Sequence, residues 1–285
     1  MRVLISGAGG QLGLDVVAAC MAAGDDVHAF DSAGLDIGSR SDVHGAITML
    51  RPDAVINCAA WTAVDACEAD PERALAVNGT AVRWLAEAAH RAGAHLVQVS
   101  TDYVFDGGLD RPYHEHDDTN PQSAYGRSKL AGEREALALG PSATVVRTSW
   151  VCGRNGNNMV KTVMRLAQQH PQLSFVADQV GHPTFTQDLA PVLRRLALDR
   201  LSGVVHATNQ RACSWYQFAG EVVAAMGKDP SMVQPIATAD LHPPRPAPRP
   251  ANSVLDNAVL RAAGHSPLRD FGEPLRETVA ALLAE

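Results

Sequence analysis

The sequence predicts an α/β protein, with a doubly wound parallel sheet and a smaller α/β lobe that need not be continuous in sequence. Short apolar runs alternate with longer helical patterns over residues 1–150, as expected when helices connect parallel strands. A glycine-rich turn directly follows the first apolar run. The pattern is looser over 151–285, which we assign mainly to the lobe, with some elements returning to the sheet.

Each element of the first half follows from a local pattern. Short apolar runs predict buried strands at 2–6, 27–30, 54–58, 96–100 and 143–147. The glycines lead into a helix with Leu12, Val16, Ala19 and Ala23 on one face. Further helices are expected at 39–50 (N-capped by Ser39), 71–92 and 125–139.

The second half has fewer clear elements. Helices are predicted at 158–169, 189–199, 214–226 and 274–284, with strands at 173–176 and 203–207. The proline-rich segment 243–250 has the P-x-x-P spacing of a peptide ligand. It lies between predicted elements rather than in a tail, so we expect an ordered, rigid connection.

Composition excludes several classes of protein. The 285 residues carry a net charge of −7 without a basic run, which argues against a nucleic-acid partner. No apolar run approaches the roughly 18 residues of a membrane span. The chain opens directly on a strand, so we expect no signal peptide and a cytoplasmic location. The five scattered cysteines are expected to be reduced, with Cys20 and Cys58 in the core.

The glycine-rich turn predicts a Rossmann-like dinucleotide site. Gly7 permits the tight turn, Gly10 lets the backbone approach a pyrophosphate, and Gly13 allows close packing of helix and strand. Asp31 ends the second strand, near the ~20-residue offset of a carboxylate that binds an adenosine ribose. It would repel a 2′-phosphate, although Arg40 could offset that charge, so both NADH and NADPH stay open. The alternative for Asp31 is a solvated turn residue.

Tyr125 and Lys129 predict a proton donor with a neighbouring ammonium. Their spacing places both on one helix face, and the ammonium should lower the pKa of the phenol. Thr101 ends a strand and can donate to the same carbonyl oxygen, which would polarise that carbonyl for hydride attack. The alternative is a Tyr–Lys pair on a helix surface.

The histidine-rich loop 113–118 has the residue types of a metal site. It lacks the spacing that would converge ligands on one ion. We therefore expect a solvated acidic loop and no metal.

These residues resemble the extended short-chain dehydrogenase/reductase superfamily and, within it, the dTDP-4-dehydrorhamnose reductases. The resemblance runs over almost the whole chain. It rests on motifs at 7–13, 57–65, 100–107, 125–133, 147–151, 178–184, 188–190 and 249–253. The late motifs weigh most, because superfamily members differ most in the lobe.

The resemblance implies hydride transfer from NADH or NADPH to C4 of a dTDP-4-keto-6-deoxy-L-sugar. It implies that Thr101, Tyr125 and Lys129 are catalytic, and that Thr101, Asp102 and Trp150 touch the sugar nucleotide. The expected cofactor contacts are Gly7, Gly10, Gln11, Leu12, Gly13, Asp31, Asp36, Ile37, Ala60, Trp61, Thr62, Tyr125 and Lys129.

Two departures from the family pattern limit what carries over. Cys152 stands where many relatives have tyrosine, and Gln187 replaces an acid that some relatives use in a magnesium-bridged dimer. We therefore predict neither that metal nor that dimer, and both monomer and homodimer stay open.

Two other functions remain as alternatives. One is a sugar-nucleotide epimerase or dehydratase, although dehydratases of this fold follow the threonine with Asp-Glu, and here the pair is Asp102-Tyr103. The other is a non-catalytic NADP-binding subunit, like the regulatory subunit of methionine adenosyltransferase. Such a subunit would not need Thr101, Tyr125 and Lys129 together.

Overall fold

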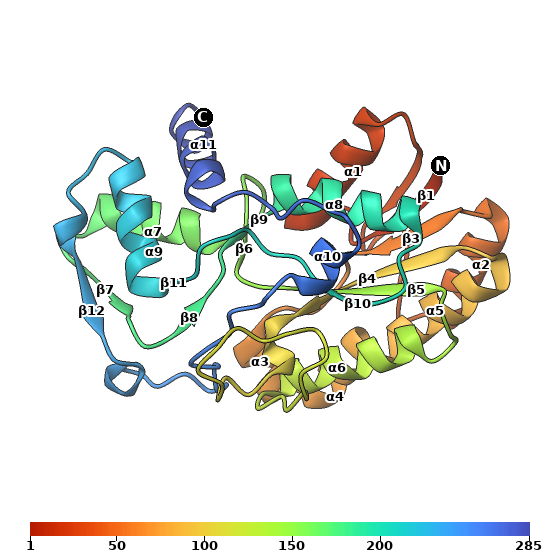
Figure 1. The fold of residues 1–285 in the computed structure, drawn as a ribbon, viewed down its shortest axis with the longest axis horizontal. Coiled ribbons are helices and arrows are strands. Elements are labelled where there is room, and N and C mark those ends of the chain that lie inside the picture. The colour runs from red at the N-terminus through yellow and green to blue at the C-terminus, as the bar shows by residue number, and fades with distance from the viewer.

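A six-stranded parallel sheet forms the centre of the computed structural model, which describes residues 1–285 (Figure 1). Its strands are β1 Arg2–Ser6, β2 Asp26–Phe30, β3 Ala54–Asn57, β4 His95–Thr101, β5 Ala143–Thr148 and β10 Gly203–His206. They lie in the order β10-β5-β4-β3-β1-β2. The predicted α/β class and every predicted strand of the sheet are confirmed.

The strand order reverses at β1. The chain passes from β1 to β2 on one side, and then places β3 against the other side of β1. The carboxyl ends of β1 and β3 therefore meet at a topological switch point, where open α/β sheets bind ligands.

Helices cover both faces of the sheet (Figure 1). Helices α1 Gln11–Ala22 and α8 Thr186–Asp199 pack on one face, while α2 Arg40–Leu50, α5 Ala81–Ala92 and α6 Ala124–Leu137 pack on the other. Successive strand residues point to opposite faces, so Val3 and Ile5 join the first core and Leu4 the second. Ser39 caps α2 as predicted, and α8 begins before the predicted residue 189.

The predicted helix 71–92 contains a π-helical turn. It consists of α4 Pro71–Leu75, the π turn η1 Ala76–Thr80, and α5. Asn78 in this turn accepts from the backbone N–H of Trp61 at 2.8 Å and donates to Ser128 Oγ at 3.0 Å. The turn therefore joins the segment after β3 to helix α6, which the helical pattern alone did not predict.

The lobe has its own core around Phe185, Phe218 and Phe271. Its helices are α7 Met159–Gln169, α9 Trp215–Ala225 and α11 Gly272–Leu283. Three two-stranded pairs complete it: β6 Val151–Cys152 with β9 Thr184–Phe185, β7 Leu173–Val176 with β12 Val233–Ile236, and β8 Val180–Gly181 with β11 Cys213–Ser214. The short helices α3 Val64–Ala69, α10 Ala258–Ala262, η2 Asp102–Val104, η3 Pro230–Met232 and η4 Thr238–Asp240 were not predicted. No helix is both long and apolar enough to cross a membrane.

The proline-rich segment is an ordered connection, as predicted. Ala247 in it is buried, and its N–H donates to Asp65 at 3.1 Å. Arg249 forms a bidentate pair with the same carboxylate, at 2.6 and 2.8 Å. These contacts attach the segment to α3 beside the carboxyl end of the sheet.

The loop 113–118 is only in part the solvated acidic loop that we expected: His116 and Asp118 are exposed, but two other residues are not. Tyr113 is buried and stacks on Phe105, with the ring centroids 4.2 Å apart. Glu115 is also buried, and its Oε1 accepts from the backbone N–H groups of His206 and Val259. The expectation failed at Glu115 because its carboxylate accepts hydrogen bonds from two otherwise unpaired backbone N–H groups and is not hydrated by solvent.

Glycine at position 132 permits the close approach of α6 to the π turn. A Cβ at Gly132 would lie 2.2 Å from the carbonyl oxygen of Asn78, whereas a Cβ at Gly220 in α9 would meet nothing within 4 Å. Gly132→Ala should therefore lower the free energy of unfolding by about 1–3 kcal/mol. Gly220→Ala, the control, should raise it by up to about 1 kcal/mol. Urea denaturation followed by circular dichroism measures both, and equal stabilities would contradict this packing.

Candidate active site

Two adjoining cavities lie at the carboxyl edge of the sheet. The first, of about 820 Å³, extends from the glycine-rich turn past the ends of β2 and β3 to the helix α4–η1–α5. The second, of about 440 Å³, lies beyond the ends of β4 and β5 and reaches the lobe. Gly10, Cys58 and Ala60 line both, so the two cavities form one continuous cleft. Cys58 is thus a wall residue of this cleft rather than the core residue that we expected.

The glycine-rich turn brings backbone N–H groups to the floor of the cleft. Gly7 has a φ of +70°, in the region that favours glycine. A Cβ at Gly13 would lie 2.1 Å from the carbonyl oxygen of Gly7, so only glycine lets α1 start this close to β1. No side chain caps the N-terminus of α1 at Gly10, which leaves its N–H groups available to a phosphate.

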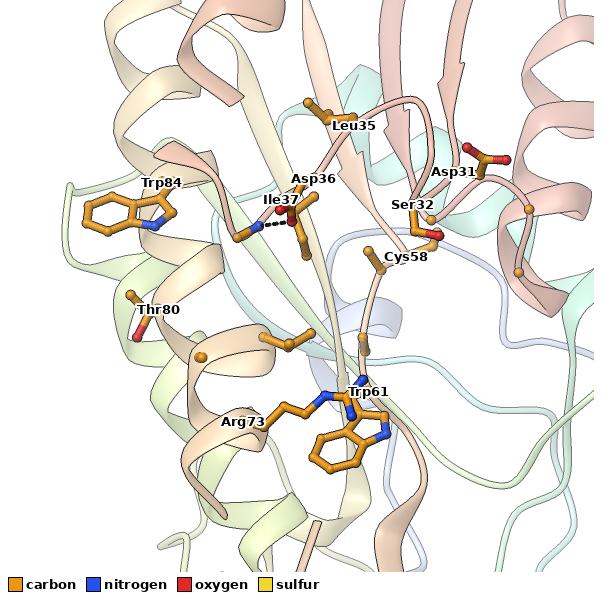
Figure 2. A pocket seen from close by; sticks show the side chains of 18 residues that line it. Asp31, Ser32, Leu35, Asp36, Ile37, Cys58, Trp61, Arg73, Thr80 and Trp84 are labelled. Atoms are coloured by element: carbon orange, nitrogen blue, oxygen red, sulfur yellow. Dashed lines mark hydrogen bonds between the residues drawn. The ribbon is translucent and has the colours of Figure 1, made fainter. Parts of the chain in front are cut away.

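Asp31 and Asp36 both line the first cavity, and each also holds a backbone turn (Figure 2). Asp31 Oδ1 accepts from the N–H groups of Ala33 and Gly34, at 3.0 and 2.9 Å. Asp36 Oδ1 accepts from the N–H of Gly38 at 2.9 Å. The turn role that we considered for Asp31 is therefore real, and it fixes the carboxylate at the cavity wall.

Arg73 is a cavity residue that the sequence analysis missed. Arg73 is exposed, and its guanidinium lies 4.5 Å from the ring centroid of Trp61. Figure 2 shows this pair at the end of the cavity away from Asp31. Arg40, which we had considered beside Asp31, instead pairs with Glu87 at 3.1 Å and is not part of the cavity wall. No signal in the sequence placed Arg73 here, because the contact depends on how α4 packs beside the segment after β3.

The second cavity brings the predicted catalytic residues together. Thr101, Tyr125 and Lys129 line it, together with Asp102 and Trp150. Ser123 caps α6 by accepting from the N–H of Gly126, so the helix begins with Tyr125 in its first turn. Each of the predicted cofactor and substrate residues lines one or both cavities: Gly7, Gly10, Asp31, Asp36, Ile37, Ala60 and Trp61 the first, and Gly10, Gln11, Leu12, Gly13, Ala60, Thr62, Thr101, Asp102, Tyr125, Lys129 and Trp150 the second.

Burial sets the protonation of Tyr125 and Lys129. We expected the ammonium to lower the pKa of Tyr125, but burial raises that pKa, and a hydrogen bond with Thr101 opposes the rise. Burial also lowers the pKa of Lys129 to about 8. Lys129 Nζ donates to the carbonyl oxygen of Val99 at 2.7 Å. At neutral pH the phenol is therefore protonated and the lysine is charged.

Asp102 forms the back of the second cavity. Thr101 Oγ1 donates to Asp102 Oδ1 at 2.9 Å, and burial raises the pKa of this carboxyl group to about 6. Because Thr101 has one hydroxyl proton, it must rotate away from Asp102 before it can donate to a substrate oxygen.

Trp150 separates the sheet from the lobe. Its φ of +45° is rare for an aromatic residue and turns the chain sharply after β5. Its ring stacks on Trp215 of α9, with centroids 3.5 Å apart. Gly181 makes room for the indole, since a Cβ there would lie 2.7 Å from it.

A chain of buried amides supports the cleft from below. Ser6 Oγ donates to Asn57 Oδ1, and Asn57 Nδ2 donates to Gln98 Oε1, both at 2.7 Å. Gln98 in turn donates to the carbonyl oxygen of Val99, the same oxygen that accepts from Lys129. Hydrogen bonds thus connect the end of β1 to the lysine through β3 and β4.

Gln187 and Cys152, the two residues that depart from the family pattern, both make contacts within the protein. Gln187 donates to Glu277 Oε2 at 2.7 Å, and Cys152 is buried in the core of the lobe. The structure has no group of three or more His, Cys, Asp or Glu residues placed to hold a metal ion.

Comparison with known proteins identifies the family. The family model described as the RmlD substrate binding domain matches residues 1–284. A dTDP-4-dehydrorhamnose reductase of Streptomyces griseus is 42% identical, over 99% of this chain and 94% of its own. The chain belongs to the dTDP-4-dehydrorhamnose reductase family. The resemblance predicted from the motifs is thereby confirmed, and the chain is an oxidoreductase.

Two further members of this family show its range. A probable dTDP-4,6-dihydroxy-2-methyloxan-3-one 4-ketoreductase of Streptomyces antibioticus is 43% identical, over 100% of this chain and 96% of its own. A dTDP-4-dehydrorhamnose reductase of Bacillus anthracis, solved in complex with NADP, is 36% identical with a TM-score of 0.94, over 98% of this chain and 99% of its own.

Proposed function

We propose that this protein reduces the C4 keto group of dTDP-4-dehydro-L-rhamnose to give dTDP-L-rhamnose, with NADH or NADPH as the reductant. The observation that carries the proposal is the convergence of Thr101, Tyr125 and Lys129 in a cavity continuous with the one at the glycine-rich turn. The names and full-length similarity of the Streptomyces and Bacillus relatives support it.

The cleft fits an extended dinucleotide. The adenosine end would lie between Asp31, Asp36 and Ile37, and the pyrophosphate would lie at the N-terminus of α1. The nicotinamide would then pass Ala60 and Thr62 into the second cavity. A bound NADH or NADPH supplies the hydride.

The residues of the second cavity would handle the proton. Tyr125, whose phenol is protonated at neutral pH, donates its proton to the C4 oxygen as that oxygen becomes an alkoxide. Thr101 donates a second hydrogen bond to the same oxygen once its hydroxyl leaves Asp102. The charged Lys129 would hold the nicotinamide ribose and would stabilise the phenolate that remains on Tyr125.

The geometry disfavours a dehydratase. Elimination of water needs a second carboxylate beside Asp102, and Tyr103 stands there instead. Its ring packs edge-on against Tyr125, with centroids 5.5 Å apart.

A direct assay tests the proposed substrate: oxidation of NADH and of NADPH in the presence of dTDP-4-dehydro-L-rhamnose, followed at the nicotinamide absorbance. Cofactor binding without oxidation would refute this substrate and favour another keto sugar, such as that of the S. antibioticus relative, or a binding subunit.

Tyr125→Phe should keep the ring packing and lose the proton donor. We expect unchanged cofactor affinity and a kcat lowered by about 10²-fold or more. Tyr113→Phe, which removes a phenol outside the cleft, is the control. Steady-state kinetics and calorimetric binding check this, and a near-normal rate for Tyr125→Phe would remove this residue from the mechanism.

Asp31→Ala should change the choice of cofactor. The carboxylate would accept from the ribose hydroxyls of NADH and repel the 2′-phosphate of NADPH, so its loss should weaken NADH more than NADPH. Dissociation constants for both cofactors measure the effect. Equal weakening would mean that Asp31 only holds the turn through Ala33 and Gly34.

Arg73→Gln tests the free guanidinium of the first cavity. If it faces the pyrophosphate, affinity for NADH, NADPH and ADP should fall together by about tenfold, and adenosine binding should stay unchanged. Arg134→Gln, on the exposed side of α6, is the matched control. Unchanged affinity for ADP would contradict a role of this guanidinium at the pyrophosphate.

A further inference from the structure

A buried ion pair joins the candidate catalytic helix α6 to strand β5 of the sheet. Glu133 of α6 and Arg147 of β5 have side chains only 4% and 5% exposed. Arg147 Nε and Nη2 donate to the two carboxylate oxygens of Glu133, at 2.9 and 2.7 Å. Ser100 Oγ donates to Glu133 Oε1 at 2.6 Å. The carboxylate therefore receives hydrogen bonds from two strands of the sheet.

Glu133 continues the helix face of the two candidate catalytic residues. Tyr125, Lys129 and Glu133 follow one another at i, i+4 spacing, so they lie in one row along α6. This row faces three consecutive residues at the end of β4. Lys129 donates to the Val99 carbonyl, Glu133 accepts from Ser100, and Tyr125 lines the second cavity together with Thr101.

The charges around Lys129 give Glu133 an electrostatic role as well. Burial favours the neutral amine, and the negative charge of Glu133 opposes it. The other titratable groups that line the same cavity as the lysine are Tyr125 on its own helix, Cys58 after β3, and Asp102 and Tyr103 after β4. Arg147 directs its donors away from Lys129, to Glu133 and to the carbonyl oxygen of Glu115.

We propose that Glu133 is a positioning residue for the reduction: held by Arg147 and Ser100, it anchors α6, and with it Lys129 and Tyr125, against the end of β4 and places a carboxylate one helical turn from the buried lysine. It lines neither cavity and so acts through the position of α6 and through Lys129. The proposal rests on the proposed function for its kinetic consequences, but its effect on the lysine is independent of the sugar substrate.

The test is the pH dependence of NADH binding and of turnover in Glu133→Gln, with Glu135→Gln on the same helix as the control. Removing the negative charge lowers the pKa of Lys129, so the lysine becomes neutral at a lower pH. The alkaline limb of both profiles should therefore move down by about one pH unit, and affinity at pH 8 should fall several-fold. Glu133→Asp keeps the negative charge, so the alkaline limb should return to its wild-type pH. The kcat should stay lowered, because the shorter side chain shifts Lys129 and Tyr125 on α6.

A stability effect alone would not move these profiles. If Glu133→Gln fails to fold because Arg147 is left unpaired, the double variant Glu133→Leu/Arg147→Met removes both charges and should show a smaller shift in the same direction, because loss of the arginine cation partly offsets loss of the carboxylate. A limb that stays in place in the folded variant overturns the proposal. NADH binding is measured without sugar, so an enzyme inactive toward dTDP-4-dehydro-L-rhamnose, which would refute the proposed function, still tests Glu133.

Discussion

The structure depends on how closely helix α6 approaches the end of β4 and the π turn. At Gly126 and Gly132 a Cβ would lie 2.2 Å from the carbonyl oxygens of Tyr103 and Asn78, so two glycines on this helix set its distance from both neighbours. That distance lets Lys129 reach the backbone of β4 and lets Asn78 bridge to Ser128. The same helix thereby brings Tyr125 and Lys129 to the wall of the second cavity.

Much of the fold could be predicted because its signals are local. Short apolar runs predicted the strands, and Ser39 predicted the start of helix α2. The spacing of Tyr125 and Lys129 predicted that both lie on one face of a helix. The site residues could be predicted for a related reason: they follow strand ends, and parallel strands bring those ends to one edge.

Other features depend on contacts between distant segments and so left no local pattern. The π turn exists where α6 packs against the helix of Asn78, and the Arg73–Trp61 contact joins two segments on either side of α3. The sequence around Glu115 indicates a surface acid, whereas its backbone partners lie far along the chain, in β10 and α10. The pKa of Tyr125 was misjudged because helical spacing predicts proximity to a charge but not the degree of burial.

The second half of the chain contributes to the sheet as well as to the lobe. Strand β10 and helix α8 come from the second half of the chain yet complete the sheet and its cover, and Arg249 returns to Asp65. A chimera that exchanges everything after Trp150 with a relative would also replace an edge strand and a covering helix. Grafting a new sugar specificity onto this scaffold therefore requires several separate segments to be transplanted together, with the returning arginine matched to its acceptor.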